Sequence, residues 1–76
     1  MTFAIHQSIK NPKYYVFTPY REDCSKIPEG LVEELGKIKF LRNSRTKEEE
    51  SDKIKERYKE IESKVCDKGF CILKIV

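Results

Sequence analysis

The apolar residues of this chain recur with two different periods, and the change of period constrains the fold more than any other feature. Residues 37–41 alternate between apolar and polar side chains, as half-buried β-strands do, and residues 2–7 are also expected to form a strand, with Phe3 and Ile5 on one face. Residues 13–18 are rich in aromatic and β-branched side chains, which favour strands. Within residues 46–67, apolar side chains recur every three or four positions, as on one face of an α-helix. This helical stripe consists of Ile54, Tyr58, Ile61 and Val65.

Turn-forming and helix-capping residues separate these segments. Asn11 and Pro12 suit a short turn, so the first two strands are expected to form an antiparallel hairpin. Pro28 fits the first turn of a helix and Gly36 fits its end, which predicts a short helix between the second and third strands. Residues 70–76 are mostly apolar, a pattern typical of a buried central strand.

Together these segments predict a single α+β domain over residues 1–76. The expected order is β-β-α-β-α-β, and the natural architecture is a four-stranded sheet with two helices on one face. The apolar patterns point Leu31, Ile61 and Ile72 into a core that must be thin in so short a chain.

The composition of the chain indicates in which cellular compartment the protein is expected. No apolar run approaches the roughly 20 residues of a membrane span, and the N-terminus lacks the basic start and long apolar stretch of a signal peptide. We therefore expect a cytoplasmic protein without membrane contact. The three cysteines, Cys24, Cys66 and Cys71, are an odd number and are expected to be reduced thiols, with Cys71 packed among apolar strand residues.

The residues do not form a recognisable catalytic or metal-binding pattern. His6 is the only histidine, and it is more simply interpreted as a surface or edge residue of the first strand than as the partner of a catalytic cysteine. The spacing of Cys66 and Cys71 differs from that of zinc knuckles. The carboxylates are flanked by Lys and Arg, as on a solvated face. We expect no catalytic residue, no metal site and no cofactor.

The charge distribution gives the main functional signal. The net charge is only +3, but residues 37–47 carry five basic side chains and no acidic one. Basic groups neutralise phosphates and aromatic rings stack on unpaired bases, so this segment is a candidate nucleic-acid-binding surface. The candidate residues are Lys37, Lys39, Arg42, Arg45 and Lys47, with Tyr14 and Tyr15 on the neighbouring hairpin. The alternative is that the basic residues only solvate a loop and the tyrosines pack in the core.

Several segments resemble the YcgL family of small bacterial proteins. That family has an aliphatic first strand ending in serine and a tyrosine-rich second strand, similar to residues 3–8 and to Tyr15-Val16. Its most specific segment, Asp-aromatic-Ser-basic-aliphatic-Pro-Glu-x-Leu at the start of a short helix, is similar to residues 23–31. Residues 69–73, after the last helix, are similar too. The resemblance implies a compact α+β fold without an assigned catalytic activity. It also implies a link to RNA processing, because some members are encoded near a ribonuclease of transfer-RNA maturation.

Three departures from the family pattern suggest a remote relative, such as one encoded by a phage or mobile element. Cys24 stands where the family usually has an aromatic residue. Residues 42–53 are more charged than their usual counterpart, and the chain stops at Val76, where members often carry a further tail.

The preferred hypothesis is a small non-catalytic accessory factor that binds RNA or an RNA-processing enzyme. The alternative is a protein-binding modulator or inhibitor, such as a phage-encoded one, with no nucleic-acid contact. Salt dependence separates the two, since phosphate contacts make binding fall steeply with salt. The partner, the RNA class and the oligomeric state stay open at this stage.

Overall fold

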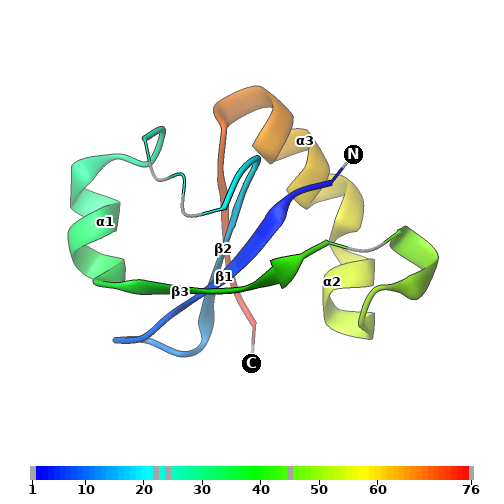
Figure 1. Cartoon of the computed structure of the whole chain (residues 1–76), viewed down its shortest axis with the longest axis horizontal. Helices are drawn as coiled ribbons and strands as arrows, with labels where there is room; N and C mark the ends of the chain where they lie inside the picture. The colour runs from blue at the N-terminus through cyan, green and yellow to red at the C-terminus, as the bar shows by residue number, and fades with distance from the viewer. Residues whose placement is uncertain (1, 22, 24, 45, 76) are drawn as a thin grey trace.

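Four antiparallel strands form one sheet in the order β3-β1-β2-β4 (Figure 1). The computed structural model describes residues 2–21, 23, 25–44 and 46–75. Along the chain the elements are β1 (Ala4–Ser8), β2 (Tyr14–Thr18), α1 (Glu29–Leu35), β3 (Ile38–Asn43), the 3₁₀-helix η1 (Lys47–Glu49), α2 (Asp52–Glu56), α3 (Tyr58–Lys68) and β4 (Cys71–Lys74). The predicted α+β class and the four-stranded sheet are confirmed.

The sheet carries helices on both faces, because neighbouring residues of an inner strand are both apolar. On β2, Val16 and Phe17 point to opposite faces, and neither is exposed to solvent. α2 and α3 cover the face of Phe17, whereas Leu35 of α1 packs on the face of Val16. The two helical layers lie on either side of the strands in Figure 1. The expected placement of both helices on one face therefore differs from the structure, since that arrangement would leave Val16 in water.

The two faces of the sheet are buried to different depths. The larger core cluster lies under α2 and α3 and consists of Phe3, Ile5, Phe17, Ile54, Tyr58, Ile61, Val65, Cys71 and Leu73. Ile61 is fully buried, as predicted. On the thinner α1 side, Leu31 is 37% exposed and Ile72 is only partly buried. The core prediction is therefore wrong for Leu31 and correct in part for Ile72.

The long helix predicted for residues 46–67 is broken twice. Glu50 and Ser51 are extended, with ψ angles of 157° and 153°, so η1 ends before them and α2 begins after them. Arg57 separates α2 from α3, and its amide donates to the carbonyl of Ile54 at 3.1 Å. The residues of the predicted apolar stripe still pack together, because α2 and α3 contribute to the same core cluster. Within the described parts of the chain, no helix is long and apolar enough to cross a bilayer.

β4 lies at an edge of the sheet and not at its centre. Cys71 and Leu73 pack under α3, while Ile72 belongs to the cluster beside α1. The apolar run thus reflects burial on both faces of the strand. An edge strand that lies between two helical layers is buried in this way too. Cys71 is buried, as predicted, whereas Cys66 is exposed on α3. Cys24 lies outside the described residues.

Candidate nucleic-acid interface

The predicted basic residues do not share one environment. Lys37 precedes β3 and Lys39 lies within it, and both are exposed. Arg42 lies near the end of the same strand and is partly buried. Arg45 lies outside the described residues, and so does the side chain of Lys47, whose backbone begins η1.

Arg42 is bound by a buried carboxylate. Its Nη1 donates to Oε2 of Glu50 at 3.0 Å, and its Nη2 donates to the other carboxylate oxygen. The Glu50 side chain has no exposed surface, whereas 34% of the Arg42 side chain is in solvent. The hydrogen bond to Glu50 raises the pKa of Arg42 above its usual value. The pair ties β3 to the segment after η1, and it offsets the charge that Arg42 would otherwise present to a phosphate.

Tyr14 and Tyr15 lie on opposite faces of β2, because successive strand residues alternate. Tyr14 packs against the smaller cluster beside α1. Tyr15 packs against the larger cluster under α2 and α3. Both side chains are partly buried. The two rings therefore do not form a single stacking surface, and the predicted site has to be divided between the two faces of the sheet.

A groove opens beside Tyr15, between the sheet and α2. Its volume is about 250 Å³. A β-bulge on β3 shapes one wall, because Ile5 pairs with Arg42 and the next residue, His6, pairs with Phe40. Leu41 is the extra residue, so Leu41 and Arg42 both reach the groove. The full lining is Ile5, Tyr15, Leu41, Arg42, Ser51, Lys53, Ile54 and Ile75.

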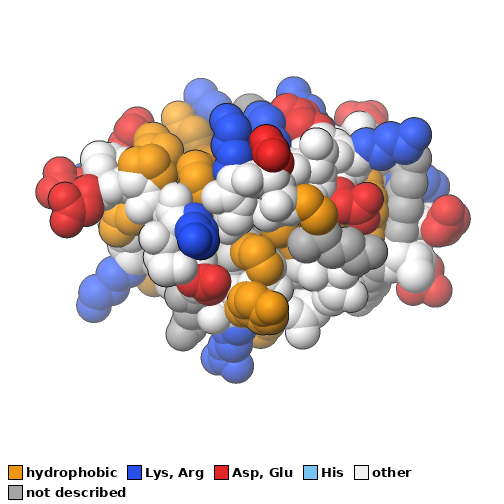
Figure 2. All heavy atoms as spheres, turned by 90° about the horizontal axis from the view of Figure 1, so that it is seen from above, with side chains coloured by type: hydrophobic (Ala, Val, Ile, Leu, Met, Phe, Trp, Pro, Cys, Tyr) orange, Lys and Arg blue, Asp and Glu red, His pale blue; other side chains and the backbone are white. Residues whose placement is uncertain are grey.

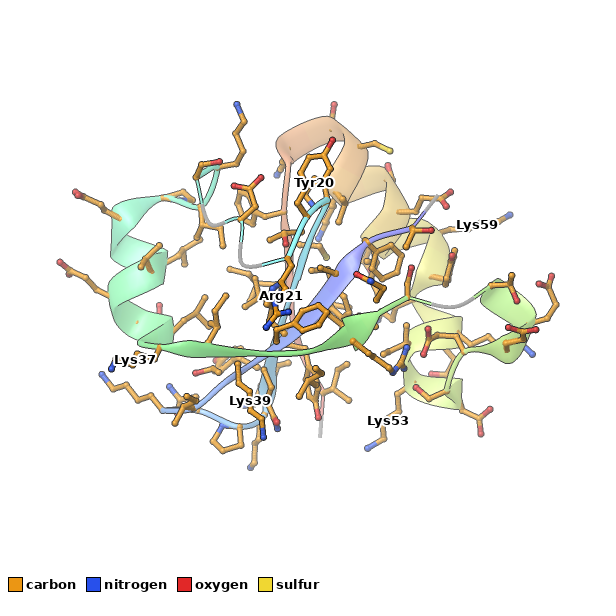
Figure 3. The ribbon with its side chains drawn as sticks, in the orientation of Figure 1. Tyr20, Arg21, Lys37, Lys39, Lys53 and Lys59 are labelled. Atoms are coloured by element: carbon orange, nitrogen blue, oxygen red, sulfur yellow. The ribbon has the colours of Figure 1, made fainter. Side chains whose placement is uncertain are left out.

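Lys53 is the functional candidate that sequence reasoning missed. It lies in the first turn of α2, lines the groove together with Tyr15, and points to the same side of the molecule as Lys39 in Figure 3. Lys39 lies two residues before Leu41 in β3 and is exposed. The groove thus combines a partly buried aromatic ring with Lys53, and Lys39 points to the same side of the molecule from β3. No sequence spacing links the two lysines, because α2 reaches the groove only through the tertiary fold.

His6 is buried, which corrects its interpretation as a surface or edge residue. It has no exposed surface, and its Nδ1 lies 3.0 Å from the carbonyl oxygen of Val16. Its ring meets Phe40 edge-on, with 5.6 Å between centroids, and the Arg21 guanidinium covers Phe40 at 4.6 Å. His6 is therefore a packed and hydrogen-bonded core residue. Among the described residues, no three His, Cys, Asp or Glu side chains come together as a metal-binding group.

Comparison with known proteins gives one match. The model of the YcgL domain matches residues 3–73, which is nearly the whole chain. The matched span includes the groove residues Tyr15, Leu41 and Lys53. No curated protein and no solved structure matches.

Proposed function

This chain belongs to the YcgL domain family, and we propose that it is a small non-catalytic accessory factor that binds single-stranded RNA. The proposed contact surface is the groove beside Tyr15. One observation supports it above the others: Tyr15 lies partly buried in an apolar groove, while Lys39 and Lys53 point to the same side of the molecule from different elements (Figure 3).

The groove has the chemistry that unpaired nucleotides require. Bases stack on aromatic rings whatever their sequence, and Tyr15 offers a ring held by the core beneath it. Lysine ammonium groups bind phosphates as point charges, so Lys39 and Lys53 are suited to the backbone on either side of a stacked base. A duplex keeps its bases stacked inside, where Tyr15 has no access to them. We therefore expect a preference for single strands.

The charge of the groove sets the expected strength of binding. Glu50 offsets the charge of Arg42, so we assign the phosphate contacts to the exposed lysines Lys39 and Lys53. Two lysines of this kind give modest binding, with a slope of log affinity against log salt of roughly −1.4. Such a surface suits a factor that acts beside a second RNA-binding protein, such as an RNA-processing enzyme, because two linked binding surfaces reach an affinity that each alone lacks.

Fluorescence anisotropy with a labelled oligouridine tests the proposal. The double variant Lys39→Ser with Lys53→Ser should weaken binding, and its plot of log affinity against log salt should be shallower by roughly 0.7 for each phosphate that is no longer neutralised. Tyr15→Leu removes the ring but keeps an apolar side chain, and it should weaken binding by about 1–3 kcal/mol with little change in that slope. The matched control is Lys59→Ser, because Lys59 is an exposed lysine of α3 that points to another side of the molecule (Figure 3).

Two results would count against the proposal once circular dichroism shows that the variants are folded. If the double variant binds oligouridine as tightly as the Lys59→Ser control at the same salt, Lys39 and Lys53 do not contact phosphates. If duplex RNA binds as well as oligouridine, Tyr15 does not act by stacking on unpaired bases.

A protein-binding modulator is the second candidate function. The observation that favours it is separate from the groove: the sheet leaves one apolar strand edge without a described neighbour.

A further inference from the structure

The outer side of β4 presents backbone groups that no described strand pairs. β4 is the last strand of the sheet and pairs with β2 alone. The amide of Ile75 donates to the carbonyl of Lys13 at 2.7 Å, which continues the register of the two strands. Hydrogen-bonded and non-hydrogen-bonded pairs alternate in an antiparallel ladder. The amides and carbonyls of Ile72 and Lys74 therefore point away from β2, toward the open edge.

The opposite edge of the sheet is protected, whereas this one is not. β3 carries an exposed lysine, Lys39, follows another at Lys37, and contains the bulge at Leu41, all of which discourage pairing with a further strand. β4 has a regular register over its whole length and a single lysine, Lys74. A mostly apolar edge strand with one lysine and no bulge is a place where another strand can add.

Two hollows border β4 on its α1 side, and the larger also reaches α3. One, of about 400 Å³, is lined by Leu31, Phe70 and Ile72 together with Lys64, Lys68 and Cys71. A second, of about 330 Å³, lies beside Tyr14 and Lys74. In Figure 2, hydrophobic side chains gather next to α1, with basic side chains beside them. The residue of an added strand opposite Ile72 would meet the first hollow, and the residue opposite Lys74 would meet the second.

Lysines near the β4 edge determine which charge an added strand should carry. Lys64 and Lys68 line the larger hollow, and Lys74 lies on β4 itself. Lys64 is paired with Glu60 at 3.2 Å, but among the residues that the structure describes no ion pair involves Lys68 or Lys74. An incoming segment with carboxylates would complement these charges.

We propose that β4 accepts an extended acidic segment of a partner protein, which adds to the sheet as a fifth strand. An apolar side chain of that segment occupies the hollow at Leu31, Phe70 and Ile72, and its carboxylates lie near Lys68 and Lys74. Main-chain hydrogen bonds to Ile72 and Lys74 fix the register, and the hollows select the side chains. The proposal does not depend on the RNA groove, which adjoins this edge at Ile75.

A second copy of this chain is a less suitable occupant. Pairing two β4 edges would bring Lys64, Lys68 and Lys74 of both copies to one interface, where like charges oppose association. A partner segment rich in Asp or Glu avoids that repulsion.

The test begins with a selection of random peptides displayed on phage, with the whole protein as bait. The enriched peptides should alternate apolar with other residues and carry an excess of carboxylates. Their binding is then compared between Lys74→Ala and Lys74→Pro. Both variants lose the charge, but only proline removes the outward amide, and it breaks no hydrogen bond to β2 because that amide points away from β2. We expect Lys74→Pro to bind about tenfold more weakly than Lys74→Ala.

Amide hydrogen exchange in the unmodified protein gives a readout that does not depend on the variants. The amides of Ile72 and Lys74 should exchange quickly in the absence of peptide and become protected when an enriched peptide binds. The amide of Leu73, which faces β2, should change much less.

Three outcomes would overturn the proposal. No acidic extended peptide is enriched, or the enriched peptides bind Lys74→Pro and Lys74→Ala equally well without protecting Ile72 and Lys74. Alternatively, sedimentation shows that the protein alone is a dimer that Lys74→Pro dissociates, which would make the occupant a second copy.

Discussion

Replacing Arg42 with alanine should destabilise the fold by about 3 kcal/mol, because the substitution removes the guanidinium that donates twice to the buried Glu50 carboxylate. Removing one partner of a buried ion pair costs about 3–5 kcal/mol. The lower end applies here, since 34% of the Arg42 side chain is in solvent and the Ser51 amide still donates to Glu50 at 3.2 Å. Small domains have about 5–15 kcal/mol of stability in total, so a change of this size is large for 76 residues.

Urea denaturation followed by far-ultraviolet circular dichroism measures this change in stability. The matched background is Glu50→Gln, in which the buried group is neutral. In that background Arg42→Ala should cost only about 1 kcal/mol, the usual net value of one hydrogen bond. The difference between the two backgrounds is the coupling energy of the pair. A cost below about 0.5 kcal/mol, typical of surface substitutions, or an equal cost in both backgrounds, would refute the reasoning. If the prediction holds, weaker RNA binding by an Arg42 variant has to be corrected for the fraction that is unfolded.

Two further predictions test the packing. Ile61→Ala should lower the free energy of unfolding by about 2–5 kcal/mol, because Ile61 is fully buried. Leu31→Ala should lower it by about 1 kcal/mol or less, because Leu31 is 37% exposed. Similar urea midpoints for the two variants would contradict the assignment of the core. Iodoacetamide should modify Cys66 before Cys71 in the folded protein, because Cys66 is exposed and Cys71 is buried. Burial also raises the pKa of the Cys71 thiol and keeps it protonated. Equal labelling rates, measured by mass spectrometry, would show that β4 is not packed as described.

The parts of the fold that the sequence predicted are those set by local patterns. The helical stripe that includes Ile54, Ile61 and Val65 enters one core cluster, as its spacing indicated. The two-faced sheet was also visible in the sequence, because Val16 and Phe17 are adjacent apolar residues in one strand, but only one face was assigned a helical layer. The apolar residues of β4 indicate burial on both faces, which the pattern alone does not distinguish from a central position in the sheet.

The parts that it did not predict depend on contacts between distant segments. Residues 46–67 contain good helix formers, and Ser51, a residue type common at N-caps, gives only a weak local sign of the break. The ion pair between Glu50 and Arg42 of β3 holds the extended backbone in place. The candidate site changed for the same reason. The sequence points to Tyr15 and Lys39, whereas Lys53 falls within the predicted helix and reaches the groove only because α2 packs beside β3.

The most direct test of the proposed function is a titration of the isotopically labelled protein with oligouridine, followed by nuclear magnetic resonance. The proposed function predicts that shift changes concentrate at Tyr15, Lys39, Leu41, Lys53 and Ile75, and that they fade as salt is raised. The amides around Lys59 on α3 should not move. Shift changes confined to another surface, or none at concentrations where oligouridine is in large excess, would contradict the claim that this groove binds RNA.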